Sequence, residues 1–322
     1  MPEETQNTNR PPAWQTLLAF SIVYLVWGTT FLAIRIGVHE VSPFLFAAMR
    51  FLIAGGVLFG WTLAQGDKFP NAREWVSVFI VAFLIFVMDY GLLFWAEQRV
   101  PSGVAAVLLA TIPAFTALAE ITLLRTQKLT VSLGAALLIG LCGVAVLVSR
   151  SLDLGGEPVN RAGDAALLVA SVSWSIATAL TKKLPMPSTK VMNSGAQMFA
   201  GGILLALSAG VLGEFRTFHP SAVSRGAWLA LLYLVIAGSI AGFTAYIWLI
   251  HHESLTKVGT YAYVNPVVAV FVGYFLAGEP LGPRTLLGAL FVLISVVMIT
   301  MASARRATAA RRTPRAADAV ET

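Results

Sequence analysis

Two charged side chains stand inside long apolar stretches of this sequence. Arg50 lies in the apolar run at residues 44–64, and Asp89 lies in the run at residues 75–96. A charge inside lipid is costly, so each of these side chains needs a partner or a function. We expect the two side chains at similar depth, where an ion pair would stabilise both. The alternative is a functional role for Asp89, in proton coupling or in binding a substrate amine.

Two tryptophans form a second kind of candidate. Trp27 and Trp174 each lie about ten residues from the ends of an apolar run that is long enough to cross a bilayer. Most tryptophans of membrane helices lie at the water interface instead. Their mid-depth position therefore favours the wall of a cavity over an interfacial anchor, although packing in the core is an equal alternative.

Further aromatic side chains share helical faces with each other. Tyr90 and Phe94 are four residues apart, and Phe243 and Tyr246 are three apart, which places each pair on one face of a helix. Such faces can stack against an apolar or aromatic solute. The predicted cavity wall comprises Trp27, Tyr90, Phe94, Trp174, Phe243, Tyr246, Tyr261 and Asn265.

Two prolines interrupt apolar runs near these candidates. Pro113 and Pro266 each remove a backbone donor, which predicts a helix kink and frees a carbonyl one turn earlier. A freed carbonyl at mid-membrane can accept a hydrogen bond from an ammonium group. The alternative is a kink that serves packing alone.

The sequence lacks the motifs of several other chemistries. It holds no metal-binding cluster of His, Cys, Asp and Glu, no phosphate-binding glycine loop and no catalytic serine motif. We therefore expect no metal, no cofactor and no enzymatic activity. Cys142 is the single cysteine, so the chain has no internal disulfide.

The composition indicates a membrane protein. Hydrophobic residues make up 57% of the 322 residues, charged residues make up only 12%, and the mean hydropathy is +0.77. Soluble domains carry about 25% charged residues. Apolar runs predict ten spans, at residues 17–36, 44–64, 75–96, 102–124, 130–149, 163–183, 191–212, 227–249, 256–277 and 284–303.

A pattern of tryptophan and proline occurs twice in the chain, at an offset of 153 residues. The three residues Trp75, Trp95 and Pro113 are followed by Trp228, Trp248 and Pro266. Each copy holds five predicted spans, and an odd number makes the second copy enter the membrane from the opposite side. The predicted fold is an all-α integral membrane protein of ten transmembrane helices in two inverted five-helix repeats.

The predicted boundaries follow from this repeat. Residues 1–15 form an N-terminal tail, residues 16–150 the first repeat, residues 161–303 the second repeat, and residues 304–322 a basic tail. The second copy has Gln197 near the Arg50 position and Gly242 at the Asp89 position, so the charged pair is not part of the repeated scaffold.

Lys and Arg predict the orientation. Fourteen of the 22 basic residues fall in tails and connections on the side of Met1, and seven fall on the other side. The positive-inside bias therefore places both termini in the cytoplasm. The tail arginines are expected near anionic lipid, and we expect no nucleic-acid partner.

Short motifs identify a family. They are Trp27-Gly28-Thr29-Thr30-Phe31, Ser42-Pro43, Arg50-Phe51, Asn265-Pro266, Gly278-Glu279-Pro280-Leu281 and Gly288-Ala289. In this order the chain resembles the EamA branch of the drug/metabolite transporter superfamily over about residues 15–303. The first copy departs from the family pattern where Arg125-Thr126-Gln127-Lys128-Leu129 replaces a Gly-Glu turn.

The resemblance implies a function and a place for it. It implies export or exchange of small metabolites, including amino acids, across a bacterial cytoplasmic membrane, through a cavity lined by the first, third and fourth spans of each half. We expect a secondary transporter that exports amino acids or related metabolites by alternating access. One alternative is an exporter of cationic drugs, for which Asp89 is the deep acid. A weaker alternative is a membrane enzyme that transports nothing. Proton exchange, facilitated flux and the oligomeric state stay open.

Overall fold

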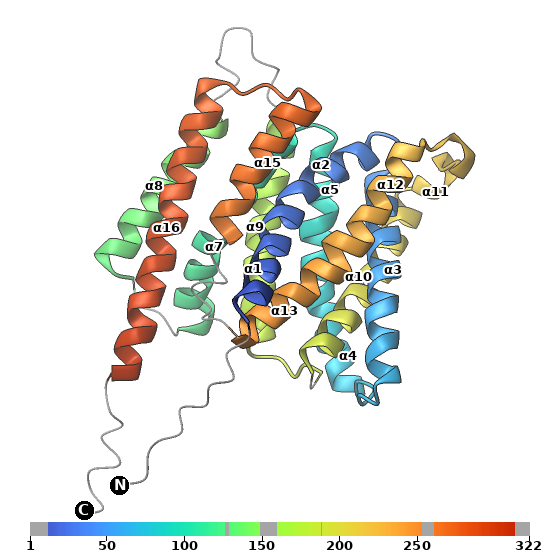
Figure 1. The fold of residues 1–322 in the computed structure, drawn as a ribbon, viewed down its shortest axis with the longest axis horizontal. Coiled ribbons are helices and arrows are strands. Elements are labelled where there is room, and N and C mark those ends of the chain that lie inside the picture. Colours follow the sequence, from blue (N-terminus) through green and yellow to red (C-terminus); the bar gives the residue numbers. More distant parts are fainter. Residues whose placement is uncertain (1–11, 126–128, 149–159, 188, 253–260, 313–322) are drawn as a thin grey trace, which may run out of the picture.

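The computed structural model describes residues 12–125, 129–148, 160–187, 189–252 and 261–312. Within these residues all regular structure is helical, and the helices form one bundle (Figure 1). The first residues of α1 and the last residues of α16 lie at the same end of that bundle (Figure 1). The all-α prediction is therefore confirmed for the described residues.

The first half of the chain forms helices that correspond to the first five predicted spans. They are α1 (Ala13–Ser21), η1 (Ile22–Val26), α2 (Trp27–Val38), α3 (Pro43–Ala64), α4 (Ala72–Ala82), η2 (Phe83–Gly91), α5 (Leu92–Glu97), α6 (Ser102–Leu109), α7 (Ile112–Ala119), η3 (Glu120–Leu124) and α8 (Val131–Val148).

The second half continues in the same way. Its helices are α9 (Arg161–Thr181), α10 (Lys190–Val211), α11 (Glu214–Thr217), η5 (Pro220–Ala222), α12 (Arg225–Tyr233), η6 (Leu234–Ala241), α13 (Gly242–His252), α15 (Tyr261–Ala277) and α16 (Pro283–Arg312). The last helix passes the predicted end of the span at residue 303, because the alanines and arginines that follow are strong helix formers.

Seven helical segments are long and apolar enough to cross a membrane. They are Ala13–Val38, Pro43–Ala64, Ala72–Glu97, Ser102–Leu124, Arg161–Thr181, Lys190–Val211 and Arg225–Tyr246. Three further predicted spans fall on shorter apolar helices, namely Val131–Val146, Val264–Ala277 and Pro283–Ile299.

The local sequence explains where several helices begin. Asn71 accepts hydrogen bonds from the first turn of α4, and the Glu74 side chain accepts one from the Asn71 backbone in return. Thr189 caps α10 and Ser224 caps α12 in the same manner, each through its hydroxyl. These caps lie in the connections between apolar runs, so they fix the ends of the spans.

Helices α3 and α10 pack closely against each other, because glycines let their backbones approach. A Cβ atom on Gly195 would lie 2.7 Å from the Phe59 nitrogen, and one on Gly202 would lie 2.7 Å from the Leu52 nitrogen. A Cβ on Gly55 would overlap the Phe199 backbone. Helices α8 and α16 form a second pair, beside the rest of the bundle (Figure 1), where Gly143 lies against Val292.

Two helices of the bundle contain π-helical stretches that matter for the centre of the molecule. The η2 segment carries Asp89 and Tyr90, and the η6 segment carries Gly238 and Ser239. Each π turn widens the helix locally and often marks a functional site. Both stretches face the cavity described next.

Candidate functional site

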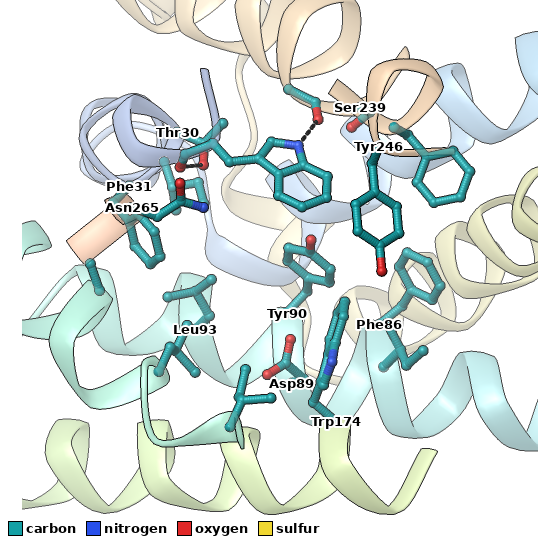
Figure 2. Close-up of a pocket in the computed structure, with 18 of the residues that line it drawn as sticks. Thr30, Phe31, Phe86, Asp89, Tyr90, Leu93, Trp174, Ser239, Tyr246 and Asn265 are labelled. Carbon is teal, nitrogen blue, oxygen red and sulfur yellow. Dashed lines mark hydrogen bonds between the residues drawn. The ribbon is translucent and has the colours of Figure 1, made fainter. Parts of the chain in front are cut away.

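A cavity of about 320 Å³ lies in the centre of the bundle. Residues of α2, α3, η2, α7, α9, η6, α13 and α15 line it, so both halves of the chain contribute (Figure 2). All the predicted site residues except Phe94 line this cavity: Trp27, Arg50, Asp89, Tyr90, Pro113, Trp174, Phe243, Tyr246, Tyr261, Asn265 and Pro266.

The placement of Phe94 at the cavity wall was wrong. Phe94 is fully buried and packs against Phe46 of α3, with their ring centroids 6.0 Å apart. The helical face that lines the cavity passes through Tyr90 and Leu93 instead. Phe94 therefore lies on the flank that α3 covers.

Aromatic rings form contacts across the two halves of the chain. Trp27 lies 5.4 Å from Tyr246 and 5.3 Å from Tyr261 by ring centroids. Tyr90 of the first half lies 6.1 Å from Trp174 of the second half. Each central tryptophan thus contacts a tyrosine from the opposite half. Tyr90, Trp174 and Tyr246 surround the same space in Figure 2, and Trp27 lines the same cavity.

The indole of Trp27 is also held by a hydrogen bond. Its Nε1 donates to the carbonyl of Gly238 at 3.0 Å. This bond fixes the edge of the ring against η6. Trp27 is therefore an ordered wall of the cavity rather than a ring that rotates freely.

The predicted ion pair between Arg50 and Asp89 is not formed. Arg50 donates from Nε to Ser239 Oγ at 3.0 Å, and its guanidinium lies over the rings of Phe51 and Tyr90 at 4.8 and 5.4 Å. The positions of the two residues in their predicted spans indicate a similar depth, but they do not determine the direction of each side chain around its helix. Packing of α3 against η6 turns Arg50 toward Ser239.

Several buried polar atoms at the cavity lack a partner. They are Arg50 Nη1, Asp89 Oδ1 and Asn265 Oδ1. Buried polar groups are normally hydrogen-bonded, so unsatisfied ones mark a place where a bound molecule can supply the missing partner. The other such atoms in the described residues belong to Glu97 and Ser102, which do not line the cavity.

The prolines differ in their local effect. Helix α6 ends at Leu109 and α7 begins at Ile112, so Pro113 stands in the first turn of a new helix. A hydroxyl satisfies one carbonyl near this break, since Ser175 Oγ donates a hydrogen bond to the Ile112 carbonyl at 3.1 Å. Pro266 lies inside α15, which continues through it.

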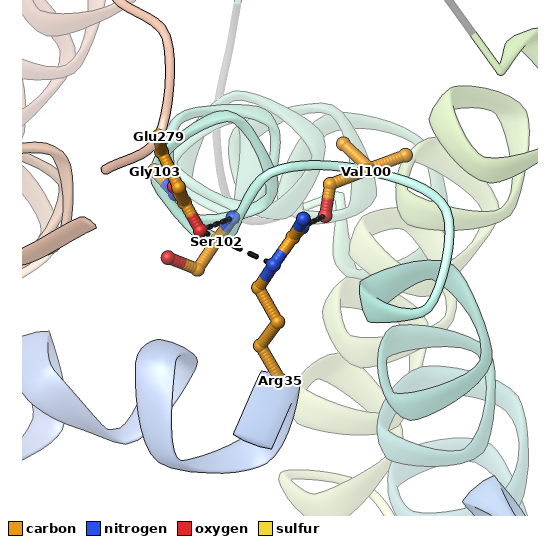
Figure 3. Close-up of polar contacts among 5 residues, drawn as sticks. All are labelled: Arg35, Val100, Ser102, Gly103 and Glu279. Atoms are coloured by element: carbon orange, nitrogen blue, oxygen red, sulfur yellow. Dashed lines mark hydrogen bonds and ion pairs between the residues drawn. The ribbon is translucent and has the colours of Figure 1, made fainter. Parts of the chain in front are cut away.

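A cluster of polar contacts lies at one end of the bundle, and we call it the Glu279 cluster (Figure 3). Glu279 accepts hydrogen bonds from the backbone nitrogens of Ser102 at 2.9 Å and Gly103 at 3.1 Å, which are the first residues of α6. Arg35 at the end of α2 lies 3.4 Å from Glu279 and donates to the Val100 carbonyl at 2.6 Å. The cluster therefore joins α2, α6 and the turn before α16.

Neighbouring carboxylates at the same end join other pairs of elements. Glu214 accepts a hydrogen bond from the Leu45 nitrogen at 2.7 Å, and burial raises the pKa of Glu214. Glu40 accepts from Ser224, and the hydrogen bonds of the Ser224 hydroxyl and backbone lower the pKa of Glu40. These contacts tie helix starts to connections and do not contact the cavity.

A second ion pair lies at the opposite end of the bundle. Lys182 at the end of α9 lies 2.8 Å from Glu120, and both side chains are partly exposed. Arg35 and Lys182 are 147 residues apart, the same offset that relates Trp27 to Trp174. The two cations thus stand at corresponding positions and each pairs with a carboxylate, but the two carboxylates, Glu279 and Glu120, do not correspond to each other.

Further residues at the cavity were not among the predicted ones. They are chiefly Thr30, Phe31, Phe51, Ser194, Gln197 and Ser239. Ser239 had a visible signal, since it is a hydroxyl inside an otherwise apolar run. Within the described part of the chain, no group of three or more metal-ligating side chains occurs.

Comparison with known proteins decides the family. The EamA-like transporter family matches residues 14–149 and again residues 161–301. The chain belongs to this family. Membership makes it a membrane transporter rather than an enzyme, which confirms both the resemblance and the prediction that it is not an enzyme.

The relatives share most of the length of this EamA protein. The uncharacterized inner membrane transporter YedA of Escherichia coli K12 is 35% identical over 285 residues, which are 88% of this chain and 90% of YedA. The uncharacterized transporter YoaV of Bacillus subtilis is 26% identical over 91% of this chain and 99% of YoaV. A crystal structure with 22% identity and a TM-score of 0.56 shares the fold over 92% of this chain and 99% of that chain.

Proposed function

We propose that this EamA protein exports amino acids or related small metabolites across the cytoplasmic membrane as a secondary transporter. The central cavity carries this proposal. It combines aromatic rings with a buried guanidinium and a buried carboxylate, neither of which has an ionic partner within 4 Å among the described residues. A small molecule with an apolar side chain and polar ends fits such a lining.

Alternating access is the mechanism that the arrangement supports best. The family matches the chain twice, and each match covers five predicted spans, so we propose ten spans in two inverted repeats. Two similar halves of this kind can exchange conformations around a fixed central site. The contacts of Trp27 with Tyr246 and of Tyr90 with Trp174 lie between the halves, where such an exchange takes place.

The orientation follows from the ends of the bundle. We place both termini in the cytoplasm of a bacterium, because the basic residues favour that side and α1 begins where α16 ends (Figure 1). The Glu279 cluster then closes the outer end of the bundle. We infer that this conformation is closed toward the outside.

Export of cationic drugs is the second candidate. Asp89 favours it, because a buried carboxylate without a cation attracts one. Arg50 opposes it, because a buried guanidinium beside the same cavity repels a permanent cation. We therefore rank this function below the export of amino acids.

Counterflow tests the proposal directly. Proteoliposomes that contain the purified protein and an excess of one unlabelled amino acid should accumulate the same amino acid in labelled form, with saturable kinetics. Vesicles without protein are the control, and a panel of the twenty amino acids identifies the cargo. A uniformly flat panel, with uptake of a lipophilic cation instead, would establish the drug-export alternative.

A further inference from the structure

The unpaired polar atoms of the cavity indicate which groups the cargo must carry. This inference rests on the proposed function, because it concerns the cargo of the same site. Arg50 Nη1 and Asp89 Oδ1 are buried and carry no hydrogen bond, although each belongs to a group that is charged in water. A lone charge in an apolar interior costs on the order of several kcal/mol, so a partner of opposite charge bound in the cavity would stabilise each of these groups.

Arg50 lines the cavity and has one buried nitrogen without a hydrogen-bond partner. Its side chain is 3% exposed, and its Nε is already bound by Ser239 while its flat face rests on Phe51 and Tyr90. These contacts fix the plane of the guanidinium and leave Nη1 unused. A planar guanidinium held in this way matches the two oxygens of a carboxylate.

Asp89 offers the opposite charge from another wall. It is 3% exposed, and no Lys or Arg of the described residues lies within 4 Å of its carboxylate. In Figure 2, Asp89 lies beside Trp174 on one side of the cavity, whereas Ser239, the partner of Arg50, lies on the other side. Both charged residues line the same cavity.

We propose that Arg50 binds the carboxylate and Asp89 binds the ammonium group of a zwitterionic cargo. A free α-amino acid neutralises both buried charges at once, whereas an amine, an amide or an N-acylated acid leaves one of them unpaired. Asn265 Oδ1 supplies one more acceptor for the ammonium group. The rings of Trp27, Tyr90 and Trp174 then surround the side chain of the cargo.

The size of the cavity agrees with a cargo of this class. About 320 Å³ is near the lower limit of small-molecule sites. The aromatic lining favours an apolar side chain, because rings stack well against one another. We therefore choose phenylalanine as the probe for this proposal.

The test compares four ligands on the wild type and two variants. The ligands are phenylalanine, phenylalaninamide, N-acetylphenylalanine and phenethylamine, and binding is followed by the fluorescence of the tryptophans in proteoliposomes. The wild type should bind phenylalanine about 10- to 100-fold more tightly than the amide or the N-acetyl compound, since a hydrogen bond to a charged group contributes that much.

Each variant should abolish one preference and keep the other. In Arg50→Gln the preference for phenylalanine over its amide should fall to about twofold or less, while the preference over N-acetylphenylalanine persists. In Asp89→Asn the reverse pattern is expected. These ratios do not depend on the fraction of protein that folds, so a partly unfolded variant still gives an answer.

Matched substitutions outside the cavity serve as controls. Arg99 is exposed and lies over Trp95, and Asp67 accepts a hydrogen bond from Thr189, so neither contacts the cavity. Arg99→Gln and Asp67→Asn should keep both preferences. If the wild type transports phenylalanine but binds the amide and the N-acetyl compound equally well, the zwitterion proposal is overturned and the transport proposal stands. If no amino acid is transported at all, both are overturned.

Discussion

The indole of Trp27 occupies the space that a side chain at Gly242 would need. A Cβ atom on Gly242 would overlap Trp27 Nε1 and would lie 3.1 Å from the Ala237 carbonyl. Gly242 is the counterpart of Asp89 in the second half, at the offset of 153 residues. The second half therefore has no room for a carboxylate at this position, because Trp27 of the first half covers it.

Gly242→Ala should consequently displace Trp27. The added methyl group forces the indole away from Gly238, which breaks the hydrogen bond of 3.0 Å and narrows the cavity. We expect a loss of about tenfold or more in the initial rate of counterflow, since misplacement by about 1 Å at a binding site has effects of that order. Gly60→Ala is the control, because no atom lies within 4 Å of a Cβ there. Equal rates in both variants would contradict this role of Trp27.

Glu279→Gln should weaken closure of the end that we propose to face outside. The glutamine keeps one acceptor for the start of α6 but loses the charge that holds Arg35. The loss of charge-assisted hydrogen bonds costs about 1–3 kcal/mol, which shifts the balance toward an outward-open state about 5- to 150-fold. A cysteine reporter at the cavity, Ser194→Cys in a Cys142→Ala background, should then react faster with an impermeant thiol reagent added outside.

Glu214 provides the matched control for that experiment. It lies at the same end and accepts hydrogen bonds from the backbone of Leu45 and Phe44, but it does not join α2 to α6. Glu214→Gln should leave the labelling rate of the reporter unchanged. If the reporter reacts at the same rate in Glu279→Gln and in the protein with Glu279, the Glu279 cluster does not act as a gate.

Gly55→Ala should destabilise the bundle. The methyl group meets the backbone of Phe199, which cannot move aside as a flexible side chain would, so α3 and α10 must separate. Overpacking of this kind costs about 1–3 kcal/mol. Thermal unfolding in detergent should show a lower Tm for Gly55→Ala, and an unchanged or higher Tm for Gly60→Ala. A Tm equal to that of the wild type would show that the helices adjust without cost.

The sequence predicts the helices and most of the cavity because composition and spacing report depth and helical face. Trp27 and Trp174 are recognisable as central from their distance to the ends of their spans. The direction of a side chain around its helix is harder to predict. Leu93 lines the cavity in place of Phe94, and Arg50 turns toward Ser239 rather than Asp89, because the packing of neighbouring helices decides both.

The contacts of Glu279 show a second limit of prediction from the sequence. Its family motif is visible in the sequence, but its contacts with Ser102 and Gly103 join residues 177 and 176 positions apart. Nothing in the local pattern around Glu279 indicates that the start of α6 lies beside it. Such a relationship follows only from the path of the whole chain.

Protection of the cavity by the cargo tests the central claim most directly. The Ser194→Cys reporter in the Cys142→Ala background should react more slowly with a small thiol reagent when phenylalanine is present. At ten times the dissociation constant, occupancy predicts a rate about tenfold lower. A cysteine at Ser221, which is exposed in a connection outside the cavity, should react at the same rate with and without the amino acid. If counterflow of phenylalanine is saturable but the reporter at residue 194 is not protected, the cargo does not pass through this cavity.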